Sequence, residues 1–303
     1  MNNKIFLVLA VAVILILGAW FVGKNNSTPQ KAASSKLSVI TSFYPLFFFS
    51  AEIAGDRAEV KNITPSGVEP HDFEPTAQDI AQIEKSNLLI LNGGVEAWAE
   101  KIKDTIKVTT IVAGEGLFTQ QIEEEGEVVS DPHIWLSPRL AKFESKKILE
   151  GLIKVDSQNS SYYQDQEKVL EEELDSLDQK YKEGLKNCQT KDFITSHAAF
   201  GYLASEYGLN QVPISGVSPD SEPSVKDLAD LADFARINSV KYIFFESLVS
   251  PKLAKTLASE IGAQTLVLDP LEGLSDDDIA AGKNYFTVME DNLKNLQTAL
   301  QCQ

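Results

Sequence analysis

The chain is poor in the residues that most often bind metals or cross-link a fold. It has three histidines and two cysteines, and its 27 lysines and arginines are outnumbered by 44 acidic residues. The net charge of −17 argues against a nucleic-acid partner, because phosphate backbones are bound through clustered basic side chains. An acidic surface favours a cationic ligand, although it also serves solubility alone.

The N-terminus predicts export. Residues 5–22 form an uncharged apolar run after Lys4, at the lower limit for crossing a bilayer and longer than most signal-peptide cores. No cysteine follows the run, which excludes lipid attachment at a processed Cys, and no clean small-x-small cleavage site follows Val22. We expect an uncleaved membrane anchor over residues 1–23 rather than a cleaved signal peptide. Residues 24–36 are polar and read as a tether.

The cysteines, Cys188 and Cys302, are not closely spaced as in a zinc ribbon, and we do not assign them as ligands. In an exported protein, an even and small number of cysteines indicates one disulfide, here between the start of the second half and the C-terminus. Two free thiols are the alternative.

Short apolar runs alternate with helical patterns throughout residues 37–303, which predicts an α/β fold with helices on both faces of parallel sheets. Leucines and a tyrosine recur every three or four residues between 160 and 186, in a helix of roughly 35–40 Å. We interpret this helix as a link between two lobes; an ordinary core helix is the alternative. The expected divisions are an N-terminal lobe over 37–157, the linking helix over 158–187 and a C-terminal lobe over 188–303. Residues 114–129 are acidic and predict a short loop.

All three histidines lie at the ends of apolar runs. His71 and His133 follow strands of the first half through short loops, and His197 directly follows Phe193–Ser196. Asp269 directly follows another such run. Ligands of parallel α/β sheets bind beyond the carboxyl ends of strands, so we expect these four side chains to face one crevice.

Three imidazoles and a carboxylate suit Zn²⁺, and could also hold Mn²⁺ or Fe²⁺. The expected metal ligands are therefore His71, His133, His197 and Asp269, with Glu69 as the main competitor of Asp269. Asp131, Glu69 and Glu74 are candidate acceptors for imidazole N–H groups.

Four motifs, PHDFEPT, DPHIWLSP, TSHAAFGYLA and LDPLEGL, occur in this order between residues 70 and 274. Together they resemble the substrate-binding proteins of zinc and manganese ABC importers, the cluster A-I family. The resemblance extends from about Leu37 to the C-terminus. It implies two α/β lobes joined by a rigid helix, a metal bound between them by the same four residues, and a partner permease with its ATPase. It also implies a monomer at the cell surface or in the periplasm, and no enzymatic activity. Histidine at position 197 favours zinc, because manganese-binding members resemble this pattern with glutamate there.

Two features depart from the family. The acidic loop before DPHIWLSP is short and free of histidine, whereas zinc-type members often have a long histidine-rich loop there; a membrane anchor is also atypical.

Three other functions remain open: the same receptor role for Mn²⁺, a zinc hydrolase, and a metal-stabilised adhesin. The chain has no HExxH helix, and a fourth protein ligand leaves little room for an activated water.

Overall fold

The computed structural model describes residues 36–124, 127–221 and 223–303. The expected anchor over residues 1–23, and the expected tether apart from Lys36, lie outside these ranges. Among the residues that the structure describes, none belongs to a helix long and apolar enough to cross a membrane. Leu37–Gln303 forms one compact unit that contains two four-stranded sheets.

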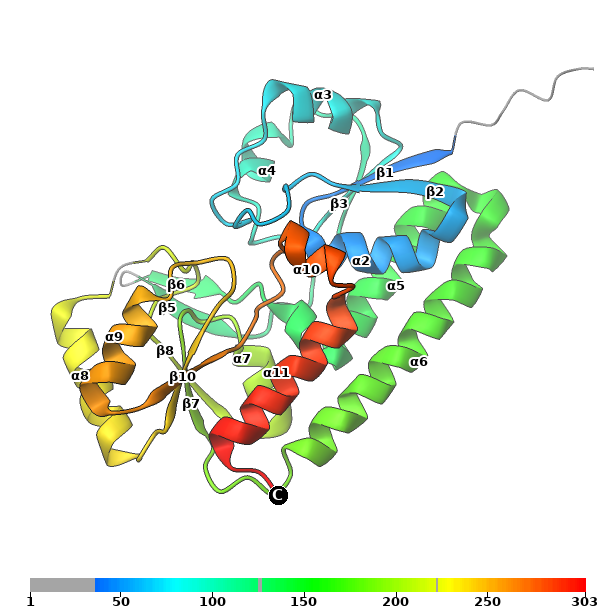
Figure 1. The fold of residues 1–303 in the computed structure, drawn as a ribbon. Helices are drawn as coiled ribbons and strands as arrows, with labels where there is room; N and C mark the ends of the chain where they lie inside the picture. The colour runs from blue at the N-terminus through cyan, green and yellow to red at the C-terminus, as the bar shows by residue number, and fades with distance from the viewer. Residues whose placement is uncertain (1–35, 125–126, 222) are drawn as a thin grey trace, which may run out of the picture. The chain divides into compact units, whose positions relative to one another are not determined.

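The first sheet has the strand order β2-β1-β3-β4, and all its strands are parallel. Figure 1 labels β1, β2 and β3. Val39 in the central strand β1 lies opposite Val60 of β2 and Leu88 of β3. The elements of this lobe are β1 (Leu37–Thr41), α2 (Tyr44–Ala54), β2 (Ala58–Asn62), α3 (Ala77–Lys85), β3 (Leu88–Leu91), α4 (Ala97–Ile102), β4 (Thr109–Val112) and α5 (Pro138–Val155).

Helices cover both faces of this sheet. Leu88 and Ile90 of β3 point into the core formed with α2 and α5, whereas Leu89 and Leu91 point into a second cluster with Trp98 of α4. Because successive side chains of a strand face opposite ways, a strand buried on both faces must be apolar at every position. The sequence LLIL of β3 meets that requirement, as predicted.

The second sheet has the order β10-β9-β7-β8 and is also parallel. Ile194 of β7 lies opposite Ile243 of β9, and both contribute to a core beneath α8 and α9. The elements of this lobe are β7 (Asp192–Thr195), α7 (Gly201–Tyr207), β8 (Asn210–Pro213), α8 (Val225–Ile237), β9 (Tyr242–Phe245), α9 (Lys252–Ile261), β10 (Gln264–Val267), α10 (Asp276–Ala280) and α11 (Tyr285–Leu300).

A single long helix, α6 (Ser160–Gly184), connects the lobes and runs beside α11 (Figure 1). Its apolar stripe is buried, and the Tyr181 hydroxyl donates to the Met289 carbonyl of α11 at 2.7 Å. Beyond α6, Cys188 forms a disulfide with Cys302, which confirms the predicted pairing. The two predictions of a two-lobed α/β fold and a linking helix are thus confirmed.

The segment over 114–129 is not simply a loop. It contains an antiparallel hairpin of β5 (Gln121–Glu124) and β6 (Glu127–Ser130), in which Ile122 lies opposite Val129. The prediction of a loop was wrong here because a hairpin of short strands needs only alternate apolar side chains, and the acidic residues obscured that pattern.

Candidate metal centre

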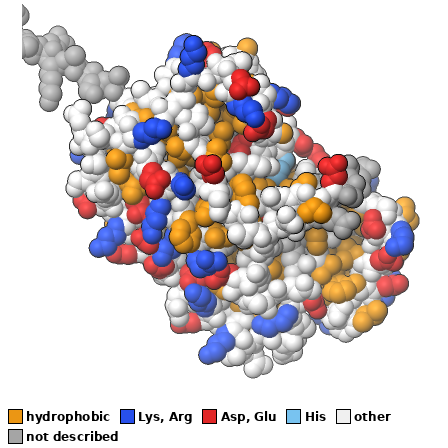
Figure 2. Space-filling model, turned by 180° about the vertical axis from the view of Figure 1, so that it is seen from behind, with side chains coloured by type: hydrophobic (Ala, Val, Ile, Leu, Met, Phe, Trp, Pro, Cys, Tyr) orange, Lys and Arg blue, Asp and Glu red, His pale blue; other side chains and the backbone are white. Residues whose placement is uncertain are grey.

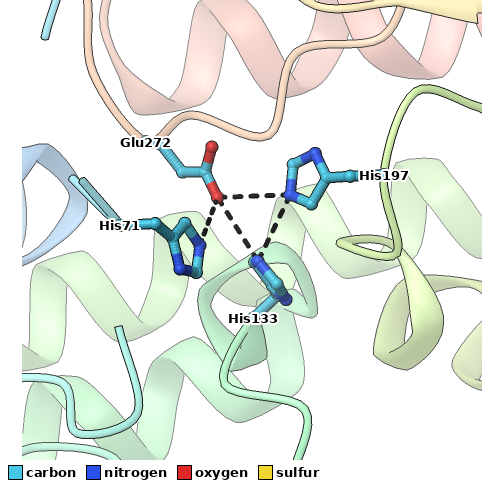
Figure 3. Close-up of side chains that lie close together, drawn as sticks. All are labelled: His71, His133, His197 and Glu272. Carbon is cyan, nitrogen blue, oxygen red and sulfur yellow. Dashed lines mark hydrogen bonds and ion pairs between the residues drawn. The ribbon is translucent and has the colours of Figure 1, made fainter. Parts of the chain in front are cut away.

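Four side chains from both lobes converge between the sheets (Figure 3). His71 lies between β2 and α3, and His133 immediately precedes a 3₁₀ turn that leads into α5. His197 lies two residues after β7, and Glu272 lies in the segment between β10 and α10. One ligand atom from each residue lies within 4.8 Å of the other three. The structure thus brings together the three predicted histidines, with Glu272 as the carboxylate.

One oxygen of Glu272 lies at the centre of these contacts. Its Oε1 atom is 3.2 Å from His71 Nε2, 3.3 Å from His133 Nε2 and 3.4 Å from His197 Nε2. The Nε2 atoms of His133 and His197 are themselves 3.4 Å apart. Ligands at the corners of a tetrahedron with zinc bonds of about 2.0–2.1 Å are separated by about 3.3–3.4 Å. These four separations therefore match the ligand–ligand distances of a tetrahedral zinc site.

Carboxylates fix the orientation of two imidazoles. Asp131 Oδ1 lies 2.8 Å from His133 Nδ1, and Glu246 Oε1 lies 2.7 Å from His197 Nδ1. Since carboxylates accept hydrogen bonds, the Nδ1 atoms carry the protons, and the Nε2 lone pairs remain for a metal. The prediction for Asp131 is confirmed. Glu246 follows β9 directly, but its role was not predicted.

The centre is buried. The side chains of His133 and His197 have no exposed surface, and that of His71 is 8% exposed. On the face shown in Figure 2, histidine forms only a small pale-blue area. Buried charges interact more strongly than exposed ones, so the ligand set is held in an environment that strengthens metal binding.

The charges of the centre shift its titration. Burial lowers the pKa of His197, but the carboxylates of Glu246 and Glu272 outweigh burial and hold the pKa well above its usual range. Burial also opposes protonation of His133, whose pKa is nevertheless raised by hydrogen bonds to Asp131 and Glu272. Burial raises the pKa of Glu272, but His197 and the hydrogen bonds to the histidines lower it well below the usual value. Without a metal, protons therefore occupy the cluster.

Asp269, the expected fourth ligand, does not join the cluster. Its side chain accepts hydrogen bonds from the Ser247 hydroxyl and, at 2.7 Å, from the Leu271 backbone N–H. Burial raises its pKa to about 6. Asp269 stabilises the turn after β10, and the structure places Glu272, three residues further on, at the position expected for it.

The turn from Asp269 to Glu272 has an unusual backbone. Leu271 has a φ of 59°, in the left-handed region that a bulky side chain rarely adopts. The Pro270 carbonyl accepts a hydrogen bond of 2.7 Å from Trp135 Nε1 of the first lobe. Strained backbone of this kind persists where neighbouring contacts hold it, commonly at functional sites. Asp269 accepts a hydrogen bond from the Leu271 backbone N–H and so forms an Asx turn. In the sequence, the only signal for Glu272 was that it is a second carboxylate shortly after this turn residue.

The remaining predicted residues lie nearby but outside the ligand set. Glu69 accepts a hydrogen bond from the His71 backbone N–H at 3.2 Å, and burial together with Glu272 raises its pKa to about 9. Glu74 pairs with Lys101 at the surface and does not contact an imidazole that the structure describes, so its predicted role was wrong. The raised pKa of Glu69 keeps its carboxyl group protonated at neutral pH. A protonated carboxyl group is a poor metal ligand.

Two α/β lobes with one buried cluster of three histidines and a carboxylate that could hold a metal ion are the arrangement expected of a metal-binding solute-binding protein. The family described as "Zinc-uptake complex component A periplasmic" (ZnuA) matches residues 39–299. The high-affinity zinc uptake system protein ZnuA of Bacillus subtilis is 43% identical over 293 residues, covering 91% of this chain and 92% of that protein.

A further relative, known from its sequence and from a crystal structure of one of its domains, comes from Streptococcus pneumoniae. The zinc-binding lipoprotein AdcA is 42% identical over 97% of this chain, which spans only 60% of AdcA. The crystal structure of the Zn(II)-bound ZnuA-like domain of AdcA has a TM-score of 0.76 and 41% identity, and covers 88% of this chain and 99% of that one.

The chain belongs to the ZnuA family of zinc-uptake proteins. This is a family of solute-binding proteins that work outside the cytoplasm, not of enzymes, as the resemblance implied.

Proposed function

We propose that this protein captures Zn²⁺ outside the cytoplasm and delivers it to the permease of an ABC importer. The ligands are His71, His133, His197 and Glu272. The observation that carries this proposal is the set of contacts of 3.2–3.4 Å among the four ligand atoms, which come from both lobes. The zinc-uptake relatives support the same function.

The donor set favours zinc over manganese. Imidazole suits zinc, whereas carboxylate, carbonyl and water oxygens suit manganese. Three of the four ligands are imidazoles, and Asp131 and Glu246 hold two of them with Nε2 directed at the centre. Manganese remains the alternative cargo that the titration below distinguishes.

The protein acts as a monomer attached to the membrane. All four ligands belong to one chain, so the centre needs no second copy. The apolar run of residues 5–22 supports an N-terminal signal or anchor, and the polar residues 24–36 support a tether that keeps the lobes near the permease.

Competitive zinc titration of the metal-free protein tests the proposal. We expect one equivalent of zinc bound well below micromolar. Glu272→Gln, which keeps the shape but removes the charged ligand, should weaken binding by about a hundredfold or more. Asp269→Asn, which disturbs only the supporting turn, should cost at most about tenfold to a hundredfold. Glu59→Gln, a surface residue paired with Lys61, is the matched control and should bind as the wild type does.

A larger loss for Asp269→Asn than for Glu272→Gln would contradict the ligand assignment. Tighter binding of manganese than of zinc would contradict the assignment of zinc as the cargo. The absence of any stoichiometric metal would contradict the proposed function.

A further inference from the structure

A polar cluster in the first lobe joins the ends of β1 and β3. The carboxylate of Glu96 accepts hydrogen bonds from the backbone N–H groups of Asn92, at 2.8 Å, and Gly93, at 2.9 Å, and from the hydroxyl of Ser42. Asn92 and Ser42 each follow a strand directly. Glu96 therefore fixes the turn after β3 in the first lobe. None of these residues contributes a ligand atom to the centre.

The fixed turn contacts the segment that bears His133. Asn92 Nδ2 donates to the Pro132 carbonyl at 2.9 Å, across 40 residues of sequence. Gly94 lies against the same proline: its φ is 83°, and a Cβ atom there would lie 3.0 Å from Pro132 Cβ. The Asn92–Gly94 turn thus binds Pro132 through a hydrogen bond and a close packing contact.

The hydrogen bond from Asn92 acts on the peptide unit that leads into His133. The Pro132 carbonyl and the His133 N–H belong to one planar peptide group, and in a trans unit they point in opposite directions. Asn92 binds the carbonyl side, while Asp131 Oδ1 accepts from the His133 N–H at 2.9 Å and contacts His133 Nδ1 at 2.8 Å. The peptide is therefore held on both edges, and the imidazole is held by the same carboxylate.

The buried amide group of Asn92 makes specific hydrogen bonds in addition to packing contacts. Asn92 is fully buried, and its Oδ1 atom has no hydrogen-bond partner within the described part of the chain. An unsatisfied buried acceptor costs about 1–3 kcal/mol. Its Nδ2 atom, by contrast, donates both to Pro132 and, at 2.9 Å, to the Gly93 carbonyl. An apolar side chain at this position would avoid the cost of the unsatisfied Oδ1 atom. The presence of an amide therefore points to a role for the Nδ2 hydrogen bonds.

We propose that Asn92 is a positioning residue for zinc binding, which, with Glu96 as its anchor, sets the direction of the His133 imidazole by holding the Pro132–His133 peptide. This inference rests on the proposed function. Partners that orient metal ligands typically change affinity by about tenfold to a hundredfold when they are removed. Asn92 lies one step further from the metal than Asp131, and we expect a loss of about tenfold.

Asn92→Asp in the full chain is the sharpest test, because it keeps the shape and replaces the Nδ2 donor by an acceptor facing the Pro132 carbonyl. The matched control is Asn87→Asp. Asn87 flanks the opposite end of β3 and uses only its Oδ1 atom, as acceptor for Ser38 N–H at 2.8 Å, which Asp retains. Zinc affinity, zinc release into excess chelator, the visible spectrum of the Co²⁺-loaded protein and the melting temperature of the metal-free protein are measured for each variant.

We expect Asn92→Asp to weaken zinc binding about tenfold, mainly through faster release, and to alter the Co²⁺ bands, while Asn87→Asp matches the wild type. If Asn92→Asp does not fold, Asn92→Ala decides, since it removes the donor without adding a charge. Unchanged affinity and unchanged Co²⁺ bands in a folded Asn92 variant would overturn the inference and leave zinc binding by the wild type intact. Failure of the wild type to bind zinc would instead overturn the proposed function.

Discussion

Glu144 differs from the other buried carboxylates of the protein. Neither of its oxygens has a hydrogen-bond partner among the described residues, although the side chain has no exposed surface. Burial and the charge of Glu96 raise its pKa well above the usual value. The other buried carboxylates accept hydrogen bonds from imidazoles, hydroxyls or backbone N–H groups; they are Glu96, Asp131, Glu167, Glu246, Asp269 and Glu272.

Replacing Glu144 by glutamine should stabilise the metal-free protein. Because the pKa of Glu144 is raised in the folded state, the unfolded chain loses this proton first, and the contribution of Glu144 to wild-type stability falls as pH rises above roughly 4.5. The gain from Glu144→Gln should therefore grow by up to about 1.4 kcal/mol per pH unit above that value. Urea unfolding with chelator at pH 5 and pH 7.5 measures it. Equal stability differences at the two pH values would contradict a protonated Glu144.

Zinc affinity should keep rising with pH above the ordinary histidine range. The pKa values of His133 and His197 are raised, so both imidazoles hold protons at a pH where free histidine has lost them. Zinc requires the neutral form and must displace those protons. Titration calorimetry in buffers of different ionisation enthalpy should show proton release on zinc binding at pH 7.5. Affinity that is flat between pH 6.5 and 8.5 would show that these raised values are wrong.

Tyr202 joins α7 of the second lobe to the base of the β5–β6 hairpin. Its hydroxyl accepts hydrogen bonds from the backbone N–H groups of Thr119, at 2.9 Å, and Gln120, at 3.1 Å. It also donates to the Asp131 carbonyl at 3.1 Å. The hairpin is therefore part of the support for His133, through Asp131.

Tyr202→Phe should weaken zinc binding severalfold and destabilise the protein by about 1 kcal/mol, because the backbone N–H groups of Thr119 and Gln120 lose their shared acceptor. Tyr207→Phe is the control from the same helix. The Tyr207 hydroxyl donates to Asp178 of α6 at 3.1 Å, away from the hairpin, so this variant should lose stability without losing affinity. Zinc competition and urea unfolding separate the two effects. Equal zinc affinities for the two variants would show that the hairpin does not help to position the metal centre.

The sequence was sufficient for elements whose pattern is local. Continuous apolar runs such as Leu88–Leu91 predicted strands buried on both faces, and histidines at strand ends predicted the convergence of three ligands. Glu272 could not be found this way, because its position depends on the left-handed backbone of Leu271 and on the Trp135 contact from the other lobe. Glu246 follows β9 directly and His197 lies two residues after β7, but strand-end position alone does not distinguish a metal ligand from the carboxylate that orients one.

One hydrophobic core extends through both lobes of the protein. Phe48 of α2 stacks on Tyr285 of α11 with ring centroids 5.8 Å apart, and the Tyr285 hydroxyl donates to the Trp135 carbonyl at 2.6 Å. This packing and α6 therefore join the two lobes through one continuous hydrophobic core. We therefore expect zinc release to involve local rearrangement of ligand segments rather than wide opening of the lobes.

The disulfide should contribute to stability but not to zinc affinity. Cys188 precedes β7 whereas His197 follows it, so the cross-link and the centre lie at opposite ends of the strand. It closes a loop with a sequence separation of 114 residues, and its removal by Cys188→Ser with Cys302→Ser should cost about 2–4 kcal/mol. Urea unfolding and zinc competition measure the two quantities. A large loss of affinity in the folded double variant would show that the cross-link shapes the centre.

The assignment of the zinc ligands is tested most directly by a crystal structure of the zinc-loaded protein with anomalous diffraction data collected at the zinc edge. We predict one strong anomalous peak between the lobes, about 2.0–2.2 Å from the Nε2 atoms of His71, His133 and His197 and from a Glu272 oxygen. A peak that lacks any of these four ligands, or one bound by Asp269 in place of Glu272, would contradict the assignment.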